Sequence, residues 1–243
     1  MIGSWTARVK IIRQKVAKNT NFLCINTNIP WIRLKSLLIP IIFKTSGPFM
    51  LPLILASSSP FRRELLDKLQ LDYQSHSPDI DESALPDESP EQLVQRLALA
   101  KAQEVGKLYP QALIIGSDQV AVLDNNIMTK PHTHENAVAQ LQNSSGRTVS
   151  FLTSLCLFNS QTQHHHLSIE YYDVEFLHLT KDQIENYLLK EKPYQCAGSF
   201  KSEGLGITLF NQFKGKDPNS LIGLPLIKLT EMLRLEGVEP LAQ

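Results

Sequence analysis

The alternation of short apolar segments with helix-start signals after residue 50 constrains the fold most strongly. Residues 53–56 and 112–117 are almost wholly apolar, which is typical of buried strands. Between and after them lie segments with helical spacing of apolar residues, often introduced by Ser or Thr caps. We expect helices over residues 60–69, 90–107, 133–141, 180 onward and 221–235. Strands that alternate with helices predict an α/β protein with a mixed sheet.

The second half of this region has the pattern of a long hairpin. Residues 148–158 and 168–179 form its predicted strands, and a shorter strand is expected over 207–210. Residues 72–90 are polar and rich in Pro, so we expect mostly loop there. Three adjacent histidines, His164, His165 and His166, fall near the hairpin tip. Because adjacent residues do not converge on one metal, we expect a solvated tip rather than a metal site.

The charges of the chain are distributed unevenly along its 243 residues. Eight of the 24 basic residues lie in residues 1–49, which contain no acidic residue, so this segment has a formal charge of +8. Residues 50–243 hold the other 16 bases against all 24 acids, a formal charge of −8. We therefore divide the chain into a basic extension, 1–49, and one domain, 50–243. An acidic domain is a poor non-specific nucleic-acid binder.

Residues 1–49 do not have the sequence signature of any one class of N-terminal segment, such as a membrane-spanning helix or a targeting peptide. Their apolar stretch at 36–43 is short and interrupted by Pro40, which disfavours a membrane-spanning helix. A targeting peptide is an alternative, although no clear cleavage site follows. We expect the native domain to begin at Met50. Three widely spaced cysteines without a CxxC pair indicate neither a disulfide scaffold nor a zinc site and favour a reducing compartment such as the cytoplasm.

The first candidate site follows the strand at 53–56. Ser57, Ser58 and Ser59 precede Pro60 and a helix, whose free N–H groups and dipole favour an anion. Arg62 adds a bidentate fork that suits phosphate. The same pattern fits a plain helix cap with surface arginines. No Walker A or G-x-G-x-x-G sequence is present in the chain.

The second candidate is Asp118, which we expect at the end of the buried strand 112–117, with residues 119–123 continuing that strand. Lys130 follows twelve residues after Asp118. A carboxylate at the carboxyl end of a buried strand lies where α/β proteins usually bind ligands, and it can deprotonate water or hold a divalent cation. A turn-capping Asp is the alternative. The acidic segment 79–82 is suited to Mg²⁺ or Mn²⁺, but it also fits an ordinary surface loop.

Together these segments resemble the Maf-like nucleotide pyrophosphatases, in the order in which that family has them. The matching segments are 55–66 (LASSSPFRRELL), 78–82 (PDIDE), 97–102 (LALAKA), 116–120 (GSDQV), 129–131 (TKP), 145–147 (SGR), 196–204 (CAGSFKSEG) and 217–225 (DPNSLIGLP). The resemblance covers nearly all of residues 50–241 and none of residues 1–49. It implies an elongated α/β fold with a central cleft, of the kind shared with inosine triphosphate pyrophosphatases.

The resemblance also implies an activity and a set of site residues. The family hydrolyses nucleoside triphosphates between the α and β phosphates and requires a divalent metal, Mg²⁺ or Mn²⁺. Asp118 matches the family's proton acceptor, and Glu82, its acidic cleft residue, would join Asp118 at the metal. The phosphate-handling positions fall on Ser57, Arg62, Lys101 and Lys130. Lys101 carried no local signal, since its helical position alone predicts a solvated surface residue.

Three specificity positions of the family fall on Phe61, Gln119 and Glu203. They resemble the subfamily that hydrolyses 7-methyl-GTP rather than the one that cleaves dTTP and UTP, which has Arg and Thr at the first two positions. An aromatic face attracts a cationic base such as 7-methylguanine, and a carboxylate accepts from its N–H groups. The alternatives are a dTTP or UTP pyrophosphatase and a non-catalytic nucleotide-binding regulator of septum formation. The resemblance also suggests a homodimer, with no nucleic-acid or membrane partner.

Overall fold

The computed structural model describes residues 31–34, 37–40 and 51–242. The chain divides into two units, Met1–Phe49 and Met50–Gln243. In the first, strands β1 (Trp31–Leu34) and β2 (Leu37–Pro40) pair antiparallel. Most of the segment predicted to lie outside the native domain falls outside the described residues, so that expectation stays a prediction.

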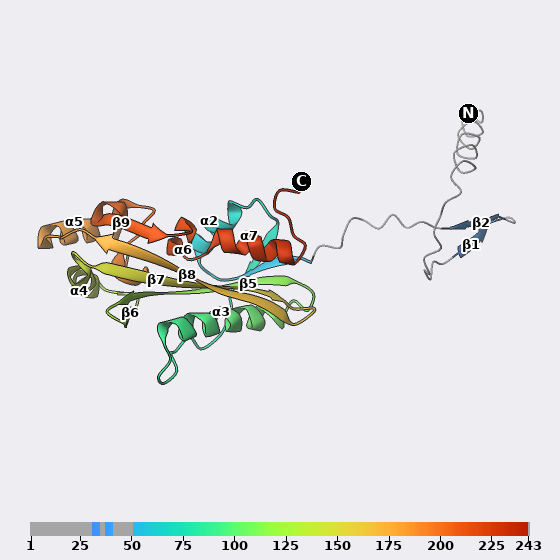
Figure 1. Ribbon diagram of the computed structural model, residues 1–243, viewed down its shortest axis with the longest axis horizontal. Helices are drawn as coiled ribbons and strands as arrows, with labels where there is room; N and C mark the ends of the chain where they lie inside the picture. The colour runs from blue at the N-terminus through green and yellow to red at the C-terminus, as the bar shows by residue number, and fades with distance from the viewer. Residues whose placement is uncertain (1–30, 35–36, 41–50, 243) are drawn as a thin grey trace, which may run out of the picture. The chain divides into compact units, whose positions relative to one another are not determined.

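The second unit is built on a mixed sheet of seven strands (Figure 1). The order is β4-β3-β5-β7-β8-β9, with β6 paired to β5. Strand β3 runs parallel to β4 and β5, and the other pairs are antiparallel. The strand bounds are β3 Leu53–Ala56, β4 Tyr73–His76, β5 Leu113–Leu123, β6 Asn126–Met128, β7 Thr148–Asn159, β8 His164–Phe176 and β9 Phe210–Gly215. The predicted α/β class with a mixed sheet is confirmed.

Helices cover both faces of this sheet, which explains why β3 and the start of β5 are apolar at every position. In β3, Leu53 and Leu55 pack on one face with helices α2 and α7, while Ile54 and Ala56 pack on the other with α3 (Figure 1). Successive side chains of a strand alternate between faces, so both parities must be apolar here. The helix bounds are α2 Pro60–Asp67, α3 Pro90–Gly106, α4 His134–Ser144, α5 Lys181–Glu191, α6 Pro218–Ile222 and α7 Leu226–Leu235.

A second part of the core lies toward the other end of the sheet. Helices α4 and α5 bury Leu141 and Leu188 there against strands β7, β8 and β9. The aromatic ring of Phe200 packs edge-on against Phe151, Phe176 and Phe210, with ring centroids 4.6–5.6 Å apart. Phe200 lies between two short 3₁₀ segments, η1 (Ala197–Ser199) and η2 (Leu205–Leu209), so this cluster fixes the irregular segment 196–209 on the sheet.

Helix α3 approaches β5 unusually closely. A Cβ placed on Gly116 would lie 2.1 Å from the carbonyl oxygen of Ala98 and 3.0 Å from the Cβ of Ala102. Only glycine permits this approach, because any side chain would push the helix away from the strand. The contact fixes the distance between the α3 residues near Ala98 and the part of β5 that follows Gly116.

Three sequence expectations for the second half are corrected. Residues 205–209 are the 3₁₀ segment η2, and the strand lies at Phe210–Gly215 instead of 207–210. The single helix expected over 221–235 is two helices, α6 and α7, because Gly223 has a φ of +119° and ends the first. Strand β8 begins at His164, so the histidines belong to the strand itself.

Among the residues that the structure describes, no helix is long and apolar enough to cross a membrane.

Candidate nucleotide-binding site

A gap in strand pairing along β5 opens a cavity. Strand β3 pairs with β5 as far as Ile115, and β6 begins to pair with it at Ala121. Residues 116–120 therefore have no strand partner on that edge among the described residues. The site lies past the carboxyl end of the parallel strand β3, where ligands bind in open α/β sheets. Asp118 lies within β5, which runs on to Leu123 as the expected continuation over residues 119–123 predicts.

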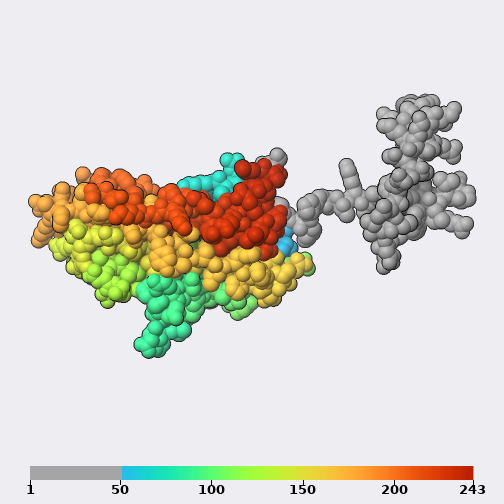
Figure 2. Space-filling model, in the orientation of Figure 1, coloured from blue at the N-terminus to red at the C-terminus, as the bar shows by residue number. Residues whose placement is uncertain are grey.

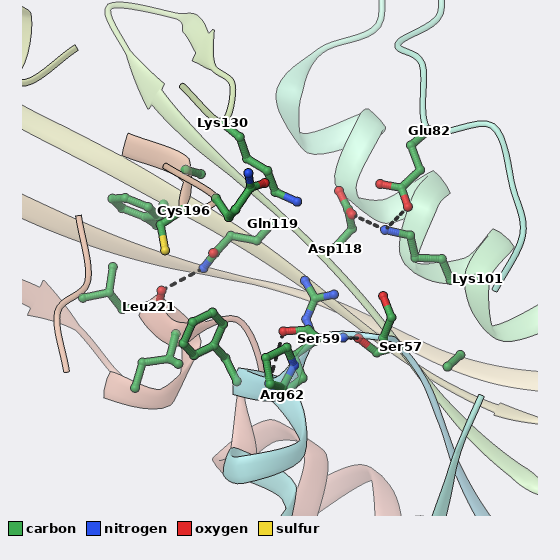
Figure 3. A pocket seen from close by; sticks show the side chains of 18 of the residues that line it. Ser57, Ser59, Arg62, Glu82, Lys101, Asp118, Gln119, Lys130, Cys196 and Leu221 are labelled. Atoms are coloured by element: carbon green, nitrogen blue, oxygen red, sulfur yellow. Dashed lines mark hydrogen bonds and ion pairs between the residues drawn. The ribbon is translucent and has the colours of Figure 1, made fainter. Parts of the chain in front are cut away.

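The cavity at this gap has a volume of about 580 Å³. That is within the usual range of small-molecule sites. All nine residues that the family resemblance assigns to the site line it, namely Ser57, Phe61, Arg62, Glu82, Lys101, Asp118, Gln119, Lys130 and Glu203. Figure 3 shows several of them converging from separate segments of the chain. The structure thus brings together residues that lie up to 146 positions apart.

The serine turn between β3 and α2 is shaped by its own hydrogen bonds. The Ser57 hydroxyl oxygen accepts from the Ser59 N–H at 3.1 Å, and Ser59 is the N-cap of α2, accepting from the Arg62 N–H at 3.4 Å. The plain helix cap and the anion-site hypothesis are therefore compatible, because the cap belongs to Ser59. Ser57 is buried at the cavity wall, and its hydroxyl hydrogen is able to donate to a ligand.

Arg62 is held in place by the backbone of a distant turn. Its Nε donates to the carbonyl oxygen of Gly223 at 2.9 Å, and the hydroxyl of Ser117 donates to the same oxygen at 2.9 Å. The left-handed conformation of Gly223 directs this carbonyl group toward both donors. With Nε occupied, the two terminal nitrogens remain for a ligand, and the guanidinium points toward Asp118 (Figure 3).

Lys101 joins two carboxylates of the cavity. Its Nζ lies 2.7 Å from Asp118 Oδ1 and 3.0 Å from Glu82 Oε1. The expectation of a solvated helix-surface lysine is wrong, since Lys101 is only 5% exposed. The close α3–β5 contact at Gly116 explains this, because it presses the face of α3 that carries Lys101 onto the strand next to Asp118.

Burial and charge act in opposite directions on Asp118. Loss of solvation raises the pKa of its carboxyl group, while the neighbouring Lys101 and Arg62 lower it and leave a net increase. Burial in turn lowers the pKa of Arg62, against the attraction of Asp118 and Glu82. A carboxylate with a raised pKa is a better proton acceptor than an exposed one.

The acidic segment 79–82 contributes one residue to the cavity. Glu82 lines it, whereas exposed Asp81 accepts from the Ser83 N–H at 2.9 Å, a hydrogen bond that lowers its pKa. Carboxylate oxygens such as those of Glu82 and Asp118 are the ligands that Mg²⁺ and Mn²⁺ prefer, usually together with substrate phosphates. The donor set therefore fits a hard divalent cation at these two residues.

Gln119 faces the opposite side of β5 from Asp118. Its Nε2 donates to Thr153 Oγ1 and Ser220 O, each at 2.8 Å, and lies 3.1 Å from Leu221 O. Backbone carbonyl groups only accept, so they fix which end of the amide is nitrogen. The side-chain carbonyl oxygen receives no hydrogen bond from the described residues, and since Gln119 lines the cavity this oxygen is available to a ligand as an acceptor.

The remaining specificity residues line the cavity together with aromatic groups that no motif in the sequence points to. Glu203 is exposed at the cavity rim and Phe61 is half-buried in its wall. Phe151 and Phe200 also line the cavity, with their rings 5.3 Å apart. Phe151 belongs to a strand and Phe200 to an irregular loop far from it in the sequence. No local sequence pattern therefore predicts that the two rings share a cavity.

The cysteines are free where they are described. Cys156 is buried, and burial raises its pKa to about 12, which fits a small core residue. Cys196 lines the cavity (Figure 3), and burial raises its pKa as well. Cys24 lies outside the described residues.

Comparison with known proteins decides the family. The model of the Maf-like protein family matches residues 52–236. The chain belongs to this family. A curated 7-methyl-GTP pyrophosphatase of Idiomarina loihiensis is 57% identical over 193 residues, which are 79% of this chain and 98% of the relative. A second, from Nitrosococcus oceani, is 56% identical over 185 residues, 76% of this chain and 93% of the relative.

A solved structure, that of the Staphylococcus aureus Ham1 protein, matches part of the chain. It is 14% identical and aligns with a TM-score of 0.39 over 51% of this chain and 71% of its own. That score is too low for a shared fold to follow from it.

Proposed function

We propose that this Maf-like protein hydrolyses 7-methyl-GTP to 7-methyl-GMP and pyrophosphate, which removes a modified nucleotide from the pool. The observation that supports this best is the convergence of a buried carboxylate with three basic side chains in one cavity. The names of two relatives more than half identical over nearly their whole length support the choice of substrate.

The charged side chains account for the chemistry. Water attacks the phosphoanhydride, one P–O bond between the α and β phosphates breaks, and the proton of the water passes to Asp118. Arg62, Lys101 and Lys130, with the Ser57 turn, stabilise the charge that develops on the phosphate oxygens. Figure 3 shows Lys130 extending into the cavity from the side opposite Arg62, so the phosphates would lie between the two.

A divalent cation is part of this proposal. Asp118 and Glu82 would hold it, and it supplies neutralisation of the triphosphate charge. Lys101, which bridges the same two carboxylates, holds them close together and keeps the pair from repelling. Assay with Mg²⁺ and with Mn²⁺ identifies the metal that supports the higher activity.

Base selection follows from the other face of β5. The carbonyl oxygen of Gln119 and the carboxylate of Glu203 are two acceptors, and the edge of guanine offers two neighbouring N–H groups. Thymine and uracil offer one. The face of the Phe61 ring would attract the positively charged base 7-methylguanine, because cations are attracted to the faces of aromatic rings.

A nucleotide panel tests the proposal. Pyrophosphate release is measured with 7-methyl-GTP, GTP, dTTP and UTP, with Mg²⁺ or Mn²⁺, for the full chain and for a shortened chain that begins at Met50. We expect the highest kcat/KM for 7-methyl-GTP and equal activity of the two chains. Preference for dTTP or UTP would support the alternative substrate class, and nucleotide binding without turnover would support a regulator of septum formation.

We further propose a cytoplasmic location, which rests on the cysteine pattern, and a homodimer, which rests on the family resemblance. Size-exclusion chromatography with light scattering tests the second of these directly.

A further inference from the structure

A second cluster of ligating side chains lies outside the nucleotide site, where the β7–β8 hairpin meets the end of α7. His164 and His166 come from the first residues of β8, and Glu236 follows α7 directly. Figure 2 shows the C-terminal segment (red) lying against the surface of the hairpin (gold) at this end of the unit. The expected solvated tip is therefore partly covered.

The two histidines share one face of the strand, because residues two apart in a strand point the same way. Their rings pack edge-on with centroids 4.7 Å apart. His166 Nε2 lies 2.8 Å and His164 Nδ1 lies 3.9 Å from the same oxygen, Glu236 Oε1. One ligand atom from each of the three residues lies within 4.8 Å of the others. Adjacent histidines do not converge, but alternate ones do.

The carboxylate of this cluster is fixed from behind. Asn159 Nδ2 donates to Glu236 Oε2 at 2.7 Å, which leaves Oε1 directed at the histidines. Asn159 is itself held, since its Oδ1 accepts from the N–H groups of Gln161 and Thr162 at 3.1 and 3.2 Å. Hydrogen bonds of this kind orient the ligands of protein metal sites.

Exposure differs across the cluster in a way that suits ion entry. The Glu236 and His166 side chains are 14% and 22% exposed, whereas that of His164 is 63% exposed. A Zn²⁺ ion about 2.0–2.1 Å from each ligand needs ligand atoms roughly 3.4 Å apart. His166 Nε2 and Glu236 Oε1 lie 2.8 Å apart and would separate slightly to hold the ion, while the exposed ring of His164, 3.9 Å from the same oxygen, would move inward. Water completes the coordination on the open side.

We propose that His164, His166 and Glu236 form a binding site for a divalent transition-metal ion of the Zn²⁺ type. Two imidazoles and one carboxylate suit zinc, copper and nickel rather than magnesium. The surroundings of Asp118 differ chemically from this cluster. The nitrogen partner of Asp118 is the ammonium group of Lys101, which only donates hydrogen bonds and binds no metal. A metal here joins the hairpin tip to the end of the last helix and so stabilises the folded chain.

Zinc titration of the full chain tests this. Protein without a polyhistidine tag is stripped of metal, and Zn²⁺ binding is measured by calorimetry with excess Mg²⁺ present to occupy hard oxygen sites. We expect one Zn²⁺ per chain at this site, and an affinity at least about tenfold weaker in His164→Ala. Zinc at tenfold excess over Kd should raise the Tm of the unmodified chain by about 3–6 °C.

His165→Ala is the matched control, because His165 is an exposed neighbour whose side chain points to the other face of β8. It should bind zinc as the unmodified chain does. Glu236→Gln keeps an acceptor for Asn159 and removes the charged ligand, so it should weaken binding as His164→Ala does. Equal zinc affinity in His164→Ala and His165→Ala, or no zinc binding by the unmodified chain, would overturn the proposal and leave a simple ion pair.

Discussion

Asp118 and Gln119 are neighbours in the sequence, but they belong to two faces of β5 that are built in different ways. Asp118 faces α3, where it is buried against an ammonium group and beside a second carboxylate. Gln119 faces α6, where its amide nitrogen is held by neutral carbonyl and hydroxyl oxygens. One face gathers charge, and the other presents a fixed neutral acceptor next to aromatic rings.

This difference separates two tasks within one cavity. Charged groups stabilise phosphate chemistry whichever base is bound, since every nucleoside triphosphate carries the same phosphates. Neutral acceptors and aromatic faces respond to the base and do little for the charge on phosphate. Substitutions on the α3 face should therefore lower turnover for all substrates, and substitutions near Gln119 should change the ranking of substrates.

The largest effect is expected from Asp118→Asn. Asparagine keeps the size of the side chain but accepts no proton, so kcat should fall by about 10³-fold or more for every nucleotide. Nucleotide affinity and the circular dichroism spectrum should change little. Rapid pyrophosphate release by this variant would contradict the assignment of the base.

Asp81→Asn is the matched control for that experiment. Asp81 lies one residue from Glu82 and is exposed, and it does not line the cavity. Its substitution should leave kcat unchanged, which separates the loss of the buried carboxylate from a general loss of acidic charge.

A smaller effect, with a distinct pH signature, is expected from Lys101→Met. Loss of this donor should lower kcat/KM about 100-fold. Asp118 acts deprotonated, so activity is lost as pH falls through its raised pKa. Removing the Lys101 charge takes away an influence that lowers this pKa, so the acid limb of the profile should move to higher pH. The measurement is kcat/KM against pH for both proteins.

The same variant affects stability, since Asp118 would lose its buried partner. A cost of about 3 kcal/mol in the free energy of unfolding is expected at neutral pH. Because the carboxyl pKa is raised in the folded state, this cost should shrink as pH falls and the group takes up its proton. In the activity measurement, an acid limb of the kcat/KM profile that does not move in Lys101→Met would contradict the electrostatic coupling of Lys101 and Asp118.

The smallest effect is expected from Phe61→Ala on the base-binding side. Loss of the aromatic face should raise KM for 7-methyl-GTP about tenfold and raise KM for GTP less, because only the first base carries a positive charge. The rate constant kcat should change little for either. Equal changes in KM for the two nucleotides would remove the stacking argument and weaken the separation of the two faces.

Local signals in the sequence were enough for the elements with strong periodicity or caps. The β3 strand and the start of α2 at Pro60 followed from an apolar run, a serine cap and a proline. The helix expected from residue 180 is α5, and the structure shows a capping box of Thr180 and Gln183 at its start. The segment 196–209 was not predictable in this way, since its conformation depends on packing of Phe200 against strands far away in the chain.

By itself, the sequence determined the α/β class, the family and the residue types that suit phosphate. Only the tertiary structure decided which face each residue occupies. Lys101 became a buried partner of Asp118 because Gly116 lets α3 approach the strand, and Gln119 became a fixed acceptor because α6 places two carbonyl groups beside it. His164 and His166 likewise contact Glu236 only because the end of α7 packs beside the hairpin. Local sequence specifies backbone conformation, but the pairing of charges depends on contacts between segments that are distant in the chain.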